Sequence, residues 1–197
     1  MELLDEESSK YDYTFKVLLL GKSSVGKSIL SSRLNSKSYF EFKKNYNSDY
    51  VATVGFEFIT KYAKLNNKII RFQIWDCCGN EIYKDLIRQF CKNAEAILIF
   101  YDYNDRYSFE RAKFYFHDVE MKRKDILYFL IRIRYELKNK ENKDFVSDEE
   151  ALEFANEKNA YFCHISAFEK YETGIYELFK LLIEKLLDNY NKHRNFI

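Results

Sequence analysis

Short apolar runs alternate with amphipathic stretches along the chain, and this predicts strands and helices in alternation. The stretches that are typical of strands cover residues 15–20, 56–65, 68–75, 96–101, 126–133 and 161–165. Asn66-Asn67 lies between two of these strands and suits a tight hairpin turn. Because strands and helices alternate without a linker, we expect one α/β domain over residues 11–197.

Four stretches are predicted to be helical. They cover residues 28–35, 108–124, 147–159 and the segment from Gly174 onward. Ser108 is expected to cap the second helix, and Ser147-Asp148-Glu149-Glu150 is a capping box that opens the third. Residues 1–10 are polar and acidic, so we expect a flexible N-terminal arm there, and residues 40–49 suit a loop.

Composition narrows the class of protein. The chain has 197 residues and is 47% apolar, so it can bury a sizeable core and disorder is not expected. Its 32 basic and 31 acidic residues nearly balance, which does not favour nucleic-acid binding. The absence of proline excludes Pro-rich linkers, and with only five glycines the position of each one is informative.

The four cysteines, Cys77, Cys78, Cys91 and Cys163, form no paired zinc pattern. Without a secretory signal, we expect reduced thiols and a cytoplasmic location. The adjacent Cys77-Cys78 is interpreted as two small buried residues in preference to a redox pair. No apolar run approaches the length of a membrane span, and no intrinsic membrane anchor is seen.

The first strand leads into Gly21-Lys22-Ser23-Ser24-Val25-Gly26-Lys27-Ser28, and a predicted helix follows. This is the G-x-x-x-x-G-K-[ST] phosphate-loop pattern in its required context. Glycine lets the backbone curl around an anion, and the helix start adds the positive end of its dipole. We expect Lys27 to neutralise the β- and γ-phosphates and Ser28 to ligate Mg²⁺. The expected nucleotide contacts here are Ser23, Ser24, Val25, Gly26, Lys27, Ser28 and Ile29.

A second phosphate motif, Asp76-Cys77-Cys78-Gly79, follows the strand that ends at Trp75. An acidic residue at the tip of a strand beside the phosphate loop can hold magnesium through water. A glycine three residues later can offer its N–H to a γ-phosphate. An Asp–Gly turn is common in any protein, but this spacing after a phosphate loop favours the nucleotide-binding interpretation.

These motifs resemble those of a small GTPase of the Ras superfamily, closest to its Rab branch. The stretch from Ile74 to Glu81 is similar to I-W-D-T-A-G-Q-E, and the stretch from Thr53 to Phe58 is similar to T-I-G-V-x-F. The stretch from Tyr101 to Phe109 is similar to Y-D-x-T-N-x-x-S-F, and Ser166-Ala167 resembles the start of the S-A-K guanine loop. The resemblance covers roughly residues 13–190.

The resemblance implies a P-loop fold in three α/β/α layers, with a six-stranded, mostly parallel sheet. It also implies a GDP/GTP switch in vesicle and membrane trafficking. Thr53 would join Ser28 and Asp76 at Mg²⁺, and Gly79 would sense the γ-phosphate. Two loops, about 39–55 and about 79–90, would be ordered by that phosphate.

The family also implies partners and a location. The partners would be an exchange factor, a GTPase-activating protein and effectors, and the protein would be cytoplasmic or peripheral on endomembranes. Typical Rabs end in a segment with prenylated cysteines, which is absent here. We therefore expect either a trimmed C-terminus or recruitment to membranes through partners.

Asn80 stands where the family has the glutamine that positions the attacking water. Its amide is kept, but its reach is shorter by about 1.5 Å, one carbon–carbon bond. Because an error of about 1 Å in placement can cost roughly 100-fold in rate, we expect Asn80 and Lys27 to support only slow GTP hydrolysis.

The residues that would bind the base differ more strongly from the family's sequence. The family's N-K-x-D aligns with Ile133-Arg134-Tyr135-Glu136. Arg134 keeps a long stem over the base and Glu136 offers a carboxylate, but Ile133 cannot replace the hydrogen bonds of asparagine. Ser166 and the backbone N–H of Ala167 are retained, whereas Phe168 replaces lysine and either flanks the base or packs on the core.

The loop before Thr53 is about six residues longer than in typical Rabs, and either Tyr39 or Phe40 could stack on the base. These residues are compatible with three functions. The first is a Rab-like switch with weak GTPase activity. The second is a pseudo-GTPase scaffold that binds nucleotide loosely, constitutively or without reading guanine. The third, a P-loop phosphotransferase such as a nucleotide kinase, is disfavoured because no Arg-rich lid is found.

Overall fold

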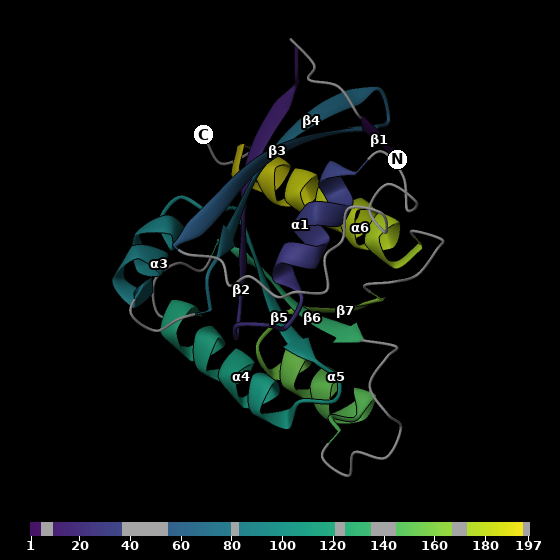
Figure 1. Ribbon diagram of the computed structural model, residues 1–197. Helices are drawn as coiled ribbons and strands as arrows, with labels where there is room; N and C mark the ends of the chain where they lie inside the picture. Colours follow the sequence, from purple (N-terminus) through teal and green to yellow (C-terminus); the bar gives the residue numbers. More distant parts are fainter. Residues whose placement is uncertain are drawn as a thin grey trace.

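The centre of the fold is a seven-stranded sheet in the order β1-β3-β4-β2-β5-β6-β7 (Figure 1). A computed structural model describes residues 1–4, 10–36, 55–79, 83–120, 125–134, 145–166 and 173–194. The strands are β1 (Glu2–Leu4), β2 (Tyr13–Gly21), β3 (Phe56–Leu65), β4 (Lys68–Cys77), β5 (Ala96–Asp102), β6 (Leu127–Arg134) and β7 (Tyr161–Ser166).

Five of the strands, β4, β2, β5, β6 and β7, run parallel to one another, so their carboxyl ends meet at one edge of the sheet. Asp76 lies one position past Trp75 on β4, in register with Leu19 of β2, and Gly21 pairs with Phe100 of β5. In open α/β sheets this edge is where ligands bind. The predicted phosphate motifs therefore meet at the carboxyl edge.

Helices cover both faces of the sheet, which confirms the predicted α/β class with its three layers. The described helices are α1 (Lys27–Asn35), α3 (Lys84–Cys91), α4 (Arg106–Glu120), α5 (Asp148–Glu157) and α6 (Thr173–Arg194). Buried residues of α1 and α6 share one hydrophobic cluster with the sheet, and those of α3, α4 and α5 share the other.

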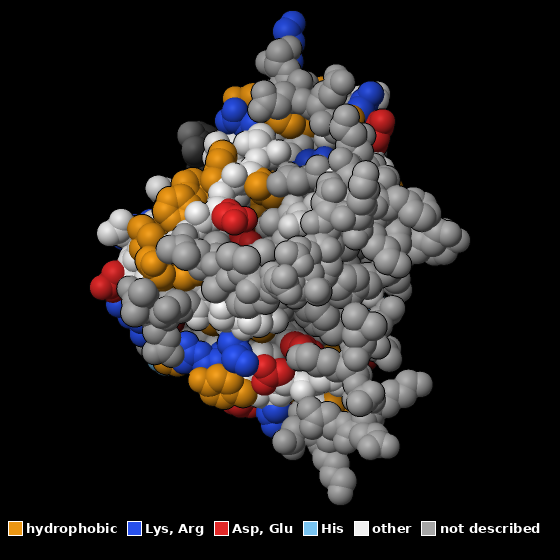
Figure 2. Space-filling view, in the orientation of Figure 1, with side chains coloured by type: hydrophobic (Ala, Val, Ile, Leu, Met, Phe, Trp, Pro, Cys, Tyr) orange, Lys and Arg blue, Asp and Glu red, His pale blue; other side chains and the backbone are white. Residues whose placement is uncertain are grey.

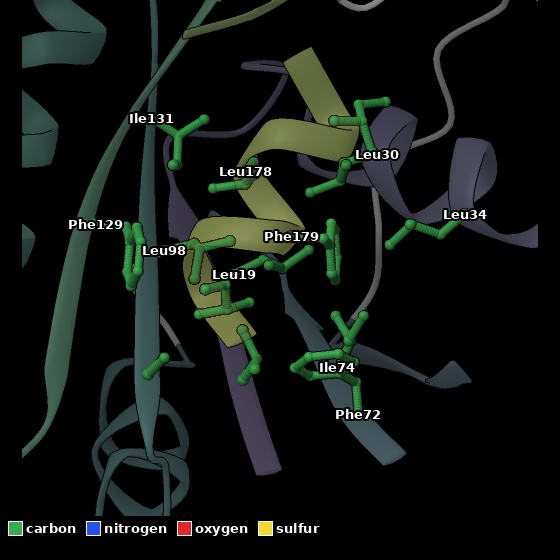
Figure 3. Close-up of a cluster of buried hydrophobic side chains, with 14 of the residues drawn as sticks. Leu19, Leu30, Leu34, Phe72, Ile74, Leu98, Phe129, Ile131, Leu178 and Phe179 are labelled. Carbon is green, nitrogen blue, oxygen red and sulfur yellow. The ribbon is translucent and has the colours of Figure 1, made fainter. Parts of the chain in front are cut away.

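The strands at the centre are apolar on both faces because both faces are covered. Along β5 all seven residues are buried, and alternate side chains enter the two clusters. Phe179 and Leu178 of α6 and Leu30 of α1 belong to the same buried cluster as Leu19 and Ile131 of the sheet (Figure 3). This packing fixes the position of the helix that follows the phosphate loop.

Two local predictions are confirmed by the backbone. Asn66 and Asn67 both have positive φ, 49° and 61°, as the turn of a tight hairpin between β3 and β4 requires. Ser147 caps α5 and accepts a hydrogen bond from the Glu150 N–H at 3.2 Å. The predicted helix start and its Ser147 cap are confirmed, whereas the Glu150 carboxylate, which would complete a capping box, accepts from Arg106 at 2.8 Å.

The start of α4 was predicted wrongly. The helix begins at Arg106, two residues before the predicted Ser108 cap. Asp105 supplies the cap instead, since its Oδ1 accepts a hydrogen bond from the Ser108 N–H at 3.1 Å. Ser108 lies fully buried inside the first turn, where its hydroxyl accepts from the Asp102 N–H at 2.9 Å.

The sheet has one strand more than the six expected, and that strand comes from the predicted flexible arm. β1 pairs antiparallel with β3, with Leu3 opposite Ala63 and Leu4 opposite Tyr62. Met1 and Leu3 pack against the hydrophobic cluster under α6. At residues 2–4 the chain is therefore a strand of the sheet and not a loose arm, because two apolar side chains find cover there.

The segment about 79–90, expected to be a switch loop, contains the helix α3. Ile87 and Cys91 point into the core, and Arg88 is paired with Asp118 of α4 at 2.9 Å. The helix depends on these contacts with distant residues. The sequence of the segment alone therefore did not predict it. The other expected switch loop, about 39–55, lies outside the described residues except at Gly55.

Candidate functional site

The phosphate loop follows β2 without a break and curls before α1. Gly21 has φ 144°, Ser24 φ 68° and Gly26 φ 100°, all values that are rare for residues with a side chain. A Cβ added at Gly21 would lie 2.6 Å from the carbonyl oxygen of Phe100, so the loop is pressed against β5. The first turn of α1 follows the loop directly. No side chain caps this turn through a hydrogen bond, and N–H groups at a helix start can bind an anion.

Lys27 brings a positive charge into this curl. Its Nζ donates to the carbonyl oxygens of Gly21 at 2.9 Å and Lys22 at 3.1 Å, and the side chain is only 5% exposed. Val25 and Ile29, which were also predicted as nucleotide contacts, turn their side chains into the core. Only the backbone of these two residues is available at the loop.

Gly79 lies directly against the phosphate loop, as its predicted role requires. A Cβ on Gly79 would lie 2.1 Å from the Ser23 nitrogen and 2.5 Å from the Lys22 carbonyl carbon. Any side chain at this position would collide with the loop backbone. The end of the Asp76-Cys77-Cys78-Gly79 motif and the loop therefore form one site.

Asp76 is the buried acid of the site, with 1% of its surface exposed. Its Oδ2 accepts a hydrogen bond from the Ser31 hydroxyl at 3.5 Å, whereas its Oδ1 is buried and has no hydrogen-bond partner among the described residues. Burial raises the pKa of the Asp76 carboxyl above its usual value, although the charge of Lys27 and a hydrogen bond from Ser28 oppose this rise.

These groups fit a magnesium ion. Mg²⁺ prefers hard oxygen ligands and keeps several waters, and here a buried carboxylate oxygen without a hydrogen-bond partner lies beside the Ser28 hydroxyl. In the part of the chain that the structure describes, no three His, Cys, Asp or Glu side chains gather as an alternative metal site. Thr53, the third predicted ligand, lies outside the described residues.

Comparison with known proteins agrees with this geometry. The sequence model of the Ras family matches residues 16–188. The chain belongs to the Ras family. The GTP-binding protein YPT1 of Saccharomyces cerevisiae is 29% identical over 183 residues, which cover 92% of this chain and 83% of that protein. The Ras-related protein RABA4b of Arabidopsis thaliana is 31% identical over 186 residues, which cover 94% of this chain and 78% of that protein.

A third relative, the Ras-related protein Rab11B of Nicotiana tabacum, is 29% identical over 185 residues, 90% of this chain and 81% of that protein. The chain is thus a Rab-like small GTPase of the Ras family, and membership implies that it binds guanine nucleotide. None of the described helices combines the length and apolarity that crossing a bilayer requires.

The base-reading side of this Ras-family site is described only in part. β6 ends at Arg134, which pairs with Ser166 of β7, so both predicted base loops leave adjacent strand ends. Ile133 is 1% exposed and belongs to the core cluster. The other predicted contacts and the predicted catalytic amide lie outside the described residues: Tyr39, Phe40, Asn80, Glu136, Ala167 and Phe168.

Two features of the site were missed in the sequence. Ser31 lies one helical turn after Ser28, and that spacing places both hydroxyls toward Asp76.

The second feature is a set of clustered aromatic rings on β3, β4 and α3, with ring centroids 4.6–5.2 Å apart. These rings, which we call the aromatic patch, belong to Phe56, Phe58, Trp75 and Phe90. Figure 2 shows hydrophobic side chains gathered over β3 and α3.

Proposed function

We propose that the protein is a GDP/GTP-regulated switch in membrane trafficking, built as one nucleotide-binding domain over residues 11–197. The observation that carries the proposal is the convergence of Lys27, Asp76 and Gly79 on the phosphate loop. Lys27 and the loop amides bind the phosphates. Ser28 and Asp76, joined by Thr53, hold Mg²⁺, which neutralises charge on the phosphates.

The proximity of Gly79 to the loop supplies a way to sense a third phosphate. The Gly79 backbone already contacts Ser23 and Lys22, so a γ-phosphate placed at the mouth of the loop requires Gly79 to move. Gly79 lies five residues before α3 and four residues after Trp75. Its displacement therefore changes the segment that leads to α3 and the neighbourhood of the aromatic patch.

The aromatic patch is the surface we propose for effectors. Phe56 and Phe58 are 41% and 46% exposed, which is unusual for large apolar side chains that lie together. The ammonium of Lys16 lies over the ring of Trp75, 4.6 Å from its centroid. Partners bound here would bring the protein to endomembranes, and exchange and GTPase-activating proteins would set its nucleotide state.

Hydrolysis is proposed to be slow because Asn80 replaces the glutamine that orients water. The residues that bind the base are proposed to be Tyr39 or Phe40, Arg134, Glu136, Ser166, Ala167 and Phe168. A pseudo-GTPase interaction scaffold, with weak, altered or constitutive nucleotide binding, is the second candidate function. It is favoured by Ile133, which is packed in the core and leaves no amide at that position for the base.

Nucleotide extracted from the purified protein and separated by chromatography distinguishes these functions. A switch retains GDP or GTP, releases it when Mg²⁺ is chelated, and prefers GTP over ATP and XTP in competition. Lys27→Ala removes the phosphate-binding cation and should abolish retention, whereas Lys113→Ala, on the exposed side of α4, should not. Empty wild-type protein without Mg²⁺-dependent binding would contradict the switch and support the scaffold.

A further inference from the structure

The phosphate loop is tied to the start of α4 by an ion pair. The Nζ of Lys22 lies 2.7 Å from Oδ2 of Asp105, and both side chains are about two-thirds buried, with 34% and 29% of their surfaces exposed. The same ammonium lies 5.2 Å from the ring centroid of Tyr107. The phosphate-loop motif accepts any residue at position 22, so the motif itself does not require this contact.

Asp105 is a fixed partner for this lysine. Its Oδ1 caps α4 by accepting from the Ser108 N–H, and its carbonyl oxygen accepts from the Ser108 hydroxyl at 2.6 Å. Ser108 is fully buried and is bound in turn by the N–H of Asp102, at the end of β5. Oδ2 of Asp105 is therefore held in place by groups in the core of the fold.

The backbone of Lys22 is central to the geometry of the site. Its carbonyl oxygen accepts hydrogen bonds from the Lys27 ammonium at 3.1 Å and from the Val25 N–H at 3.4 Å. Its carbonyl carbon is one of the atoms against which Gly79 packs. A shift of Lys22 would therefore move both the phosphate-binding cation and the contact with Gly79.

We propose that Asp105 is a positioning residue for the phosphate loop and acts through Lys22. The ion pair fixes the Lys22 carbonyl, which orients the Lys27 ammonium before any nucleotide arrives. Asp105 itself makes no contact with nucleotide in this scheme. The inference rests on the proposed binding of phosphates at this loop, and it adds a determinant of affinity outside the motif.

Variants that change charge but keep shape test the proposal. Asp105→Asn keeps an oxygen to cap α4 and loses the charge, and Lys22→Met keeps the stem over Tyr107 and loses the ammonium. Lys22→Arg keeps the charge. Glu110→Gln is the control, since Glu110 forms a similar pair with Lys113 on the exposed side of α4, 2.9 Å apart.

The first measurement is the dissociation rate of a fluorescent GDP analogue from the full chain. Asp105→Asn and Lys22→Met should each speed dissociation by about two- to fivefold, the range for a partly exposed pair. The double variant should be no faster than either single variant, because both remove the same contact. Lys22→Arg and Glu110→Gln should match the wild type.

Additive effects in the double variant, or unchanged rates in the single variants, would overturn the proposal. So would rates that change only together with a general loss of thermal stability, because that result assigns the pair a structural role. The second measurement, amide hydrogen exchange of residues 21–28 without nucleotide, needs no ligand. Asp105→Asn should speed exchange there and leave the first turn of α4 protected.

The two measurements separate the two proposals. A wild type that binds no nucleotide contradicts the proposed function, and loop exchange then still decides the role of Asp105. Faster exchange in Asp105→Asn supports the positioning role, and unchanged exchange overturns it.

Discussion

A buried carboxyl without a hydrogen bond to one of its oxygens costs stability when it is ionised. Asp76 is such a group, and burial raises its pKa above the ordinary value of 3.8. A raised carboxyl pKa means that its contribution to stability is full below the unfolded-state pKa and is lost as pH rises through the folded-state pKa. An ionised Asp76 is therefore stabilised by a cation bound beside it.

We predict that Asp76→Asn changes the pH dependence of stability. In chelator and without nucleotide, the melting temperature of the wild type relative to Asp76→Asn should fall as pH rises from about 4 to about 7, by a few degrees. Added Mg²⁺ and nucleotide should stabilise only the wild type. The control Asp85→Asn changes a largely exposed carboxyl and should show no such trend. A difference that grows with pH would contradict the prediction.

Asn80 gives the second prediction at the scale of a residue. Asn80→Gln restores the missing methylene, so single-turnover GTP hydrolysis should accelerate, by up to roughly 100-fold if placement of water is limiting. Asn93→Gln makes the same chemical change in an exposed turn after α3 and serves as the control. Equal rates for Asn80→Gln and the wild type would show that placement of the amide does not limit hydrolysis.

At the scale of elements, α3 is held to α4 by one acidic residue. Asp118 of α4 accepts Arg88 at 2.9 Å and Lys84 at 3.2 Å, and its side chain is 15% exposed. Burial opposes ionisation of Asp118, but the hydrogen bonds and charges of Arg88 and Lys84 outweigh it, so its pKa is lowered. This contribution to stability is present at neutral pH and is lost as pH falls below the ordinary aspartate value.

We predict that Asp118→Asn loosens α3 selectively. Amide exchange in residues 84–91 should become several-fold faster, and global stability should fall by about 1 kcal/mol or less. Glu153→Gln, an exposed change on α5, should alter neither quantity. Exchange in α3 that stays at the wild-type rate would show that apolar packing of Ile87 and Cys91 alone fixes the helix.

The elements that could be predicted from sequence are those whose stability is local or whose burial is complete. β5 is apolar from Ala96 to Tyr101 because both its faces are covered, and Ser147 caps α5 through a motif four residues long. β1 and α3 were missed because each depends on distant partners, Ala63 for Leu3 and Asp118 for Arg88. The Asp105 cap was missed because Ser108, three residues later, is an equally good capping type.

At the site, the motif predicted which residues gather at the phosphate loop but not which residues support the loop. The spacing of Gly21, Lys27 and Asp76 is a chemical requirement, so it is visible in the sequence. The carboxylate of Asp105 reaches the loop only through the fold, since 83 residues separate it from Lys22. The roles of the residues expected to read the base, Ser166 included, stay predictions.

At the scale of the whole molecule, β1 extends the sheet beyond the six strands expected of the family. It pairs with residues 62–64, at the end of β3 that is remote from Phe56 and the carboxyl edge. Its contribution should therefore be to stability and not to nucleotide binding. The edge that it covers would otherwise offer unpaired backbone groups to other chains.

We predict that Leu3→Ala lowers the free energy of unfolding by about 1 kcal/mol, which corresponds to about 2–4 °C in melting temperature for a chain of this size. The dissociation rate of nucleotide should not change. Glu2 is the exposed neighbour of Leu3, so Glu2→Ala is the matched control and should leave the free energy of unfolding unchanged. A neutral Leu3→Ala would show that β1 adds no stability through that side chain.

The single tryptophan of the chain has a consequence for experiments. Trp75 lies in the aromatic patch, one residue before Asp76, with the Lys16 ammonium over its ring. Its indole emission therefore originates within the surface proposed for partners, next to the proposed metal ligand. Tryptophan can be excited selectively, without the 17 tyrosines. The fluorescence of Trp75 should therefore change with nucleotide exchange and with effector binding, and no added label is needed.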